Sequence, residues 1–178
     1  MRIGILGSGL MGSKLGTIFA RAGHDVVFSY SHSERKLKRL AREAKAHARA
    51  GTPREATLGA DAVLLAVQWS RVDDVLKQAG DLSGKVIISC SLPMNASDTA
   101  LAVAHTSSGA EVLAKKVRKA DVKKIAVTLI RDVGFEAVDT GPLRIARYLE
   151  PFALAMAQLA YEGDESPEIA YRIERFGK

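Results

Sequence analysis

The sequence has few of the features that mark a secreted, membrane-spanning or metal-binding protein. Its 178 residues include one cysteine, Cys90, which excludes a disulfide within the chain and fits a reducing cytoplasm. No apolar run approaches the roughly 18–20 residues that a membrane span needs, and the N-terminus lacks the basic lead of a signal peptide. The four histidines do not have the spacing of metal ligands. We therefore expect a cytoplasmic protein with no membrane span and no metal.

Aromatic residues are also scarce, at 6% of the chain, although the net charge is +6. Proteins that bind single-stranded nucleic acid interleave aromatic side chains with basic ones, so that the bases can stack. Here the basic residues fall in stretches such as ERKLKRLAREAK and AKKVRKADVKK, which are typical of solvated helix faces. The composition argues against a nucleic-acid partner, whereas a basic surface also suits an anionic cofactor.

The first half of the chain alternates short apolar runs with helical patterns. Apolar runs predict strands within 2–6, 24–31, 61–69 and 84–93, and helical patterns follow at 10–22, 33–50 and 70–80. Gly23 should end the first helix, and Ser33 is the expected N-cap of the second. This alternation predicts an α/β fold with a Rossmann-type, doubly wound and mainly parallel sheet.

The pattern changes after Ser108. Residues 108–134 carry recurring apolar residues, and no strand or turn signal interrupts them before Gly134. The stretch FEAVDTG, at 135–141, predicts a short strand and a turn. Residues 142–163 predict a long helix that Pro151 should kink or restart. With no repeat or linker in view, we expect one domain over 1–178, with 143–178 as a C-terminal helical segment.

A glycine motif, G-x-G-x-x-G, lies between the first strand and the first helix. In this strand–turn–helix setting the first glycine allows a tight turn, the second lets the backbone approach a pyrophosphate, and the third lets the helix pack on the strand. The helix N-terminus would offer amide donors to the phosphates. The alternative is a glycine bend without a ligand. We expect dinucleotide binding by Gly7, Ser8, Gly9, Leu10, Met11 and Gly12.

The residues after the second strand favour NADP(H) over NAD(H). This segment holds Ser31 and His32, with no acid before Glu34 that could accept hydrogen bonds from the ribose. Arg35 and Lys36 follow directly, and an arginine fork beside hydroxyl groups suits a 2′-phosphate. The alternative is that both basic residues only begin a surface helix.

The ends of two further strands supply small residues at the same expected edge of the sheet. They are Ala66 and Val67 after one strand, and the segment Ser89–Pro93 after the next. Such a rim would suit a nicotinamide ring, and tight packing between strand ends is the alternative for each residue. Cys90 lies in this segment, but no histidine or carboxylate can be placed beside it, so a small packing residue is the favoured interpretation.

Three stretches of the sequence resemble one known family. They are GILGSGLMGSKLGTIFARAGHDVVFSYS, GADAVLLAV and LIRDVGFEAVDTGPLRIARYLEPFALAMAQLA. Together they resemble the NADPH-dependent oxidoreductases of the deazaflavin coenzyme F-420, whose fold also provides the reductase domain of the STEAP ferric reductases. The last stretch, with its pattern DVGF…VDTGPL…AR…EP, is much more specific than the glycine motif. The resemblance covers residues 1–116 and 123–162.

The resemblance implies an NADP-dependent oxidoreductase. It would transfer a hydride directly between NADP(H) and the flavin-like ring of a small-molecule co-substrate, such as F-420 or a flavin. No catalytic side chain is expected, because such chemistry depends on how the two rings are positioned. The glycine loop would hold the pyrophosphate, Ser31, Arg35 and His32 the 2′-phosphate, and the rim Ala66, Val67, Ser89, Cys90 and Pro93 would border the nicotinamide.

One part of the family pattern is missing from this chain. Between SGAEVLAKKV and LIRD the family has roughly 40 further residues, enough for two strands with their connections, and here they are absent near 117–122. The dinucleotide half of the site survives this gap, whereas the half that faces the hydride acceptor is incomplete. Two alternatives therefore stay open: an NADP(H)-binding module without redox activity, and a flavin, ferric or imine reductase on the same scaffold.

The C-terminal helix also predicts a homodimer. It carries more apolar residues in close succession than a lone terminal helix usually buries, and methionine and aromatic residues are enriched at interface cores. The alternative is that the helix simply covers the sheet. Members of the resembling family are commonly dimeric, which points the same way. The residues concerned are Leu149, Phe152, Ala153, Met156, Leu159 and Ala160.

Overall fold

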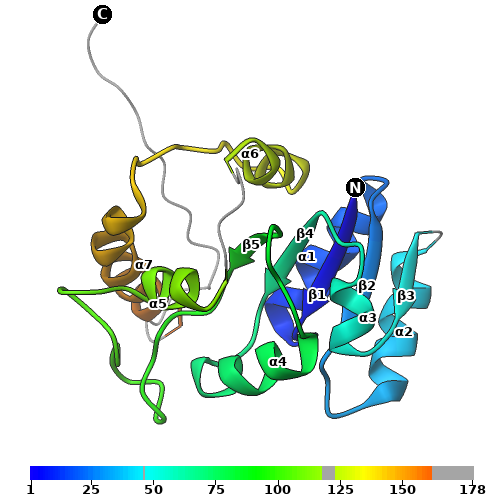
Figure 1. Cartoon of the computed structure of the whole chain (residues 1–178), viewed down its shortest axis with the longest axis horizontal. Helices are drawn as coiled ribbons and strands as arrows, with labels where there is room; N and C mark the ends of the chain where they lie inside the picture. The colour runs from blue at the N-terminus through cyan, green and yellow to red at the C-terminus, as the bar shows by residue number, and fades with distance from the viewer. Residues whose placement is uncertain (46, 118–122, 162–178) are drawn as a thin grey trace, which may run out of the picture.

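A computed structural model describes residues 1–45, 47–117 and 123–161 (Figure 1). Its centre is a sheet of five parallel strands in the order β3-β2-β1-β4-β5, with Ile3 of the first strand beside Val26 and Ala62 of its two neighbours. The predicted Rossmann-type, doubly wound fold is confirmed. The strands are β1 (Arg2–Leu6), β2 (Asp25–Ser29), β3 (Ala48–Ala50), β4 (Ala62–Leu65) and β5 (Val86–Ser89).

Helices cover both faces of this sheet. One face packs against α1 (Leu10–Arg21), α2 (Glu34–Ala44) and α6 (Lys123–Asp132), and the other against α3 (Pro53–Thr57), α4 (Val72–Ala79) and α5 (Gly109–Lys116). Two 3-10 turns precede helices: η1 (Trp69–Arg71) leads into α4, and η2 (Leu143–Ile145) leads into α7 (Ala146–Tyr161). Figure 1 shows α7 beside α5, on the side of the sheet that ends at β5.

The three central strands are buried on both faces, which explains their nearly continuous apolar runs. Ile5 of β1, Phe28 of β2 and Leu65 of β4 are completely buried. Each such side chain stabilises the fold by about 1.5–3 kcal/mol relative to an exposed one. These strands therefore form a rigid floor for whatever binds at their ends.

The second helix is shorter than the sequence predicts. Ser33 is its N-cap, as expected, because its Oγ accepts a hydrogen bond from the Lys36 amide at 3.2 Å. The helix ends at Ala44, however, because Lys45 adopts a φ of +68°, which a right-handed helix cannot continue. Ala48–Ala50 then pair with β2 as an edge strand. The prediction of one helix over 33–50 was wrong for its last residues.

Three predictions for the C-terminal half need correction or restriction. The stretch FEAVDTG forms no strand in the described structure, since the sheet ends at β5 and no neighbour is there to pair with it. The pattern over 108–134, in which the sequence shows no interruption, is broken in the structure at Val117, which is extended and ends α5. The helix α7 runs through Pro151 without restarting. Two predicted features lie outside the described residues. One is the gap near 117–122, of which only Val117 is described, and the other is the segment 162–178, the last part of the C-terminal helical segment.

A cluster of charged residues fastens α7 to α5. Arg147 donates two hydrogen bonds to the Glu111 carboxylate, at 2.7 and 2.8 Å. The Glu150 carboxylate accepts hydrogen bonds from the amides of Gly109 and Ala110, at 2.7 and 2.9 Å, so it caps the start of α5. The hydroxyl of Ser108 completes the cluster by donating to Glu111. Because Arg147 binds it, the pKa of Glu111 falls to about 2.

A second polar contact fastens α6 to the opposite face of the sheet from α5, near the start of β2. Nε2 of the buried His24 lies 2.8 Å from the Asp132 carboxylate, and the edge of the neighbouring Phe19 ring packs against the imidazole. Leu129, one turn earlier on α6, is buried in the core. Polar and apolar contacts thus place α6 against α1 together.

We expect Arg147→Met to loosen α7 from α5. The substitution keeps most of the apolar side-chain volume but removes both hydrogen bonds to Glu111, leaving that carboxylate without its cation. Amide hydrogen exchange should become faster in α5 and α7 and stay unchanged in β1 and β4. Arg144→Met is the matched control, since Arg144 is an exposed arginine three residues earlier. Equal exchange in both variants would contradict this role for Arg147.

The same cluster has a defined pH dependence. A carboxyl group whose pKa is lowered on folding stabilises the folded state above its unfolded pKa, here about 4.5, and this contribution is lost as the pH falls toward about 2. The difference in stability between the unmutated protein and Arg147→Met should therefore be largest above about pH 4.5. It should shrink as the pH falls through about 2 and vanish only below that pH in denaturant titrations, and a constant difference across this range would contradict the assignment.

Candidate dinucleotide site

The predicted site residues gather at the carboxyl edge of the sheet. The glycine loop follows β1, Ser31 and His32 follow β2, Ala66 and Val67 follow β4, and Ser89 ends β5. Neighbouring strands β1 and β4 lead into helices on opposite faces, α1 and α4. This is the switch point at which open α/β sheets bind ligands.

The three motif glycines have different surroundings. Gly7 has a φ of +107°, and a Cβ on it would collide with the carbonyl oxygen of Ala66, just after β4. A Cβ on Gly12 would collide with the carbonyl oxygen of Gly7. At Gly9, by contrast, nothing lies within 4 Å of the position that a Cβ would occupy. Gly7 and Gly12 therefore permit close packing, whereas Gly9 borders open space.

The amides of the loop divide into two groups. Those of Gly7 and Ser8 donate to carbonyl oxygens at the end of β2, at 3.2 and 3.3 Å. The hydroxyl of Ser8 is buried and donates to the Ser29 carbonyl oxygen at 2.9 Å, so this predicted phosphate ligand holds the loop against β2. No side chain caps the first turn of α1, which begins at Leu10. The amides of that turn are the donors available to an anion.

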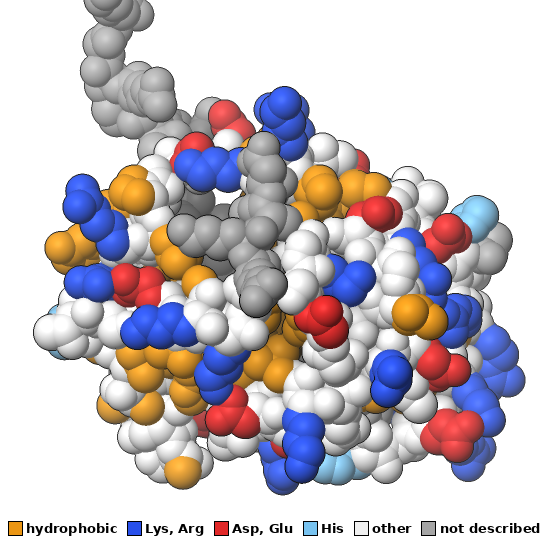
Figure 2. Space-filling model, in the orientation of Figure 1, with side chains coloured by type: hydrophobic (Ala, Val, Ile, Leu, Met, Phe, Trp, Pro, Cys, Tyr) orange, Lys and Arg blue, Asp and Glu red, His pale blue; other side chains and the backbone are white. Residues whose placement is uncertain are grey.

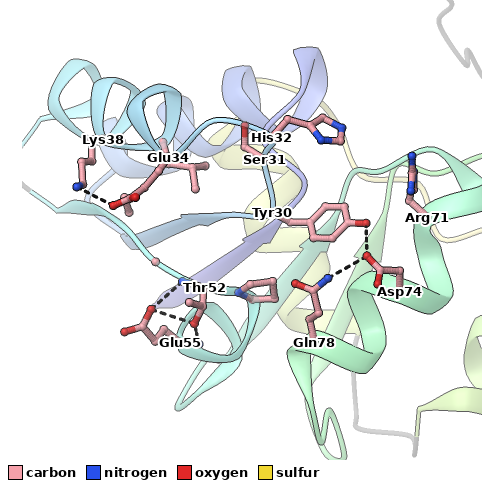
Figure 3. A pocket seen from close by; sticks show the side chains of 14 residues that line it. Tyr30, Ser31, His32, Glu34, Lys38, Thr52, Glu55, Arg71, Asp74 and Gln78 are labelled. Carbon is pink, nitrogen blue, oxygen red and sulfur yellow. Dashed lines mark hydrogen bonds and ion pairs between the residues drawn. The ribbon is translucent and has the colours of Figure 1, made fainter.

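Beside the loop, a cavity of about 690 Å³ opens between the ends of β2 and β3 and the exposed side of α4 (Figure 3). Tyr30 spans it from a left-handed backbone conformation, with φ of +54°, and its hydroxyl donates to Asp74 of α4 at 2.6 Å. Gln78 donates to the same carboxylate at 2.9 Å. These bonds, the one from Tyr30 foremost, lower the pKa of Asp74, while burial and then Asp74 raise the pKa of Tyr30.

The predicted 2′-phosphate ligands do not all line this cavity. Ser31 and His32 do, whereas Arg35 lines a neighbouring depression formed by α2. The ion pair between Glu34 and Lys38, at 2.6 Å, borders both. The sequence did not single out Tyr30, Asp74, Gln78 or Arg71, which complete the wall. The one sequence feature that connects Arg71, Asp74 and Gln78 is their helical spacing.

At the ends of β4 and β5, the small residues are held together by Ser91. Its hydroxyl donates to the Val67 carbonyl oxygen at 2.7 Å and accepts from the Val67 amide at 3.3 Å. Ala66 and Val67 are half-buried, and Pro93 is buried against Gly109 rather than lying on the rim. Cys90 is exposed, yet nearby protein atoms raise the pKa of its thiol by desolvation. A raised pKa disfavours the nucleophilic thiolate.

The described residues contain no group of three or more His, Cys, Asp or Glu side chains placed to hold a metal ion. No described helix is long and apolar enough to cross a membrane. The edge of the sheet thus combines uncapped amides, a polar cavity and a rim of small residues. Its chemistry is that of holding an anionic, extended ligand.

Comparison with known proteins finds one family whose pattern matches the first half of the chain. A family model described as NADP oxidoreductase, coenzyme F-420-dependent, matches residues 2–93, which include every strand of the sheet. No curated protein matches the chain.

Solved structures share the fold at low sequence identity. A proposed F-420-dependent NADP reductase from Arthrobacter sp. FB24 has a TM-score of 0.84 at 19% identity, over 98% of this chain and 100% of that one. A hypothetical protein from Sinorhizobium meliloti has a TM-score of 0.70 at 20% identity, over 82% of this chain and 88% of that one. A reductive aminase from Aspergillus terreus, in complex with NADPH and ethyl levulinate, has a TM-score of 0.65 at 15% identity, over 89% of this chain and 61% of that one.

The surroundings of the glycines predict that adding one methyl group destabilises the protein far more at Gly12 than at Gly9. Gly12→Ala should lower the free energy of unfolding by about 3 kcal/mol, the upper range for overpacking, because the obstacle is a backbone oxygen that cannot rotate away. Gly9→Ala should cost less than about 1 kcal/mol, since it changes only the helix N-cap. Urea titration of both variants measures the difference, and equal losses would contradict the packing role of Gly12.

Proposed function

Because this chain belongs to the coenzyme F-420-dependent NADP oxidoreductase family, we propose that it transfers a hydride between NADP(H) and a flavin-like ring, that of F-420 itself. The observation that carries this proposal is the open space at Gly9 beside the uncapped first turn of α1. A pyrophosphate would lie there, bound by the amides from Leu10 to Gly12. The NADP(H) would then run along the edge of the sheet, with its nicotinamide toward Ala66, Val67, Ser89 and Cys90.

The chain's own contribution is to position the two rings. NADPH supplies the hydride, and its two electrons pass to the acceptor ring. Ser91 fixes the backbone after β4 against the segment after β5, so the rim beside the nicotinamide is rigid. The exposed side chains of Leu10 and Met11, at 62% and 47%, would flank the ligand above the loop. Hydride transfer itself requires no acid or base from the protein.

Two alternatives remain distinguishable from this function. The absent family segment of roughly 40 residues, large enough for two strands, favours a binding module without redox activity. Against that, the Arthrobacter chain is covered over its whole length, so a solved relative in fold shares the short layout. An imine reductase is the other alternative, supported by the fold likeness to the reductive aminase with bound NADPH.

Titration and turnover together test the proposal. The protein should bind NADPH about ten- to a hundredfold more tightly than NADH, the range expected for charge-assisted hydrogen bonds to one phosphate. With NADPH bound, the protein should reduce F-420. The loss of the deazaflavin absorbance measures this reaction. Gly9→Val is the control: its side chain would occupy the pyrophosphate position, so binding should be lost while the thermal midpoint is kept.

Each alternative has its own outcome in this experiment. Binding of NADPH without oxidation by F-420, FMN or a cyclic imine would indicate the binding module. Oxidation by FMN or the imine alone would assign a different acceptor. Normal NADPH binding by Gly9→Val would contradict the role of the glycine loop.

We also propose that the protein is a homodimer through α7. None of the residues 146–160 is buried, although the helix carries an apolar stripe with spacings of three and four at Leu149, Phe152, Met156 and Leu159. Tyr148 and Leu159 are 71% and 57% exposed. Figure 2 shows hydrophobic side chains mixed with charged ones over the half of the molecule that holds α5 and α7, and more charged side chains over the half that holds α2. A stripe of this kind suits packing against a second helix.

Leu159→Glu should convert the dimer into a monomer. A charge within the apolar contact would be buried without a partner, whereas in a monomer it would face water. Light scattering at micromolar concentration should give twice the chain mass for the unmutated protein and once for the variant. Gln158→Glu, which adds the same charge at the adjacent exposed position, should remain dimeric. A monomeric unmutated protein would refute the proposal.

A further inference from the structure

The cavity beside the glycine loop has more acidic than basic residues in its wall, but its carboxylates are already bound. Glu34 pairs with Lys38 at 2.6 Å. Glu55 accepts hydrogen bonds from the amide and hydroxyl of Thr52, at 2.7 and 3.0 Å. Asp74 accepts from Tyr30 and Gln78, as described above. Figure 3 shows these bonds drawing the carboxylates toward the walls.

Arg71 is the basic residue of this wall that has no such partner. It lies at the end of η1, where its amide donates to the Gln68 carbonyl oxygen at 2.9 Å and fixes the backbone before α4. Among the described residues, no carboxylate lies within ion-pair distance of its guanidinium. Lys38, the other cation of the wall, is occupied by Glu34. The charge of Arg71 acts on the nearby Asp74 and Tyr30, but its guanidinium makes no ion pair with the described carboxylates. A guanidinium whose donors are not used in this way, in a polar cavity, is suited to a dianionic phosphate, which it can bind through two donors.

The position of Arg71 is tied to the end of β2. Arg71, Asp74 and Gln78 recur at spacings of three and four and line the same cavity from one side of α4. The bond between Tyr30 and Asp74 joins that side of the helix to the residues just before Ser31 and His32. Figure 3 shows Arg71 near the hydroxyl end of the Tyr30 ring and His32 above the ring. Arg35 lines a different depression, beyond the pair of Glu34 and Lys38.

We propose that Arg71 is the specificity-determining cation for the 2′-phosphate of NADP(H), and that Ser31 and His32 bind the same phosphate from β2. This inference rests on the proposed binding of NADP(H). It replaces Arg35, the arginine that the sequence suggests from its closeness to β2, with one that reaches the same place from the helix after β4. The hydrogen bond between Tyr30 and Asp74 then acts as a positioning contact, holding the two halves of the phosphate site together.

The test measures how each variant distinguishes adenosine 2′,5′-bisphosphate from adenosine 5′-monophosphate, and NADPH from NADH, by calorimetry. Arg71→Ala should remove the preference for the 2′-phosphorylated ligands, a loss of about ten- to a hundredfold in their affinity, and leave the affinity for NADH unchanged. Arg71→Lys should restore part of it, because lysine keeps the charge but not the planar fork. Arg54→Ala, an exposed arginine outside the cavity, controls for the change in net charge.

Arg35→Ala tests the competing hypothesis, in which Arg35 binds the 2′-phosphate. A preference that is lost in Arg35→Ala but kept in Arg71→Ala would overturn the inference, as would a preference kept in both variants. A preference lost in Arg71→Ala supports it, whether or not Arg35→Ala is also weakened. An unmutated protein that binds NADPH and NADH equally would overturn the inference but leave hydride transfer standing. If it binds neither, the proposed function fails as well.

Discussion

The close approach of the glycine loop to β4 is the contact on which the rest of this site depends. With no side chain at Gly7, the backbone turns tightly beside Ala66, and with none at Gly12, the first turn of α1 packs onto that same turn. A methyl group at either place would push α1 away from the sheet. Its amides would then no longer lie at the junction of β1 and β4, where the strands diverge to opposite faces. Packing at two glycines thus produces the open space at the third.

The C-terminal half serves this arrangement by fastening helices to the sheet rather than by adding ligands. In residues 129–160, which lie beyond the region matched by the family, Asp132 contacts His24, Arg147 binds Glu111 and Glu150 caps α5. All three contacts join segments far apart in the chain. The contacts made by this stretch are therefore structural ones between helices and the sheet. Here its side chains hold α6 and α7 in place, while Leu149 and Leu159 of α7 stay exposed.

The parts of the fold that could be predicted are those in which burial dictates the sequence. β1, β2 and β4 are covered on both faces, so they are continuously apolar and easy to recognise. β3 has three residues, too few for a period to appear, and a left-handed Lys45 precedes it in place of a glycine. FEAVDTG has strand-like composition, but a strand also needs a neighbour, and the sheet ends before it. Pairing is a property of the whole chain that no local pattern contains.

In the candidate site, too, the parts built from neighbouring residues could be predicted, and those built from distant ones could not. The glycine motif could be assigned because its three positions act on backbone within a few residues of one another, although the inward turn of Ser8 could not be foreseen. The cavity wall is different, because Tyr30 meets Asp74 across 44 residues of sequence. A search along the sequence for a phosphate-binding cation stops at Arg35, four residues after Ser31. In the folded chain, η1 brings Arg71 to the same cavity, while the turn of α2 carries Arg35 to another. Closeness in sequence is a good guide to a turn and a poor guide to a wall built from several elements.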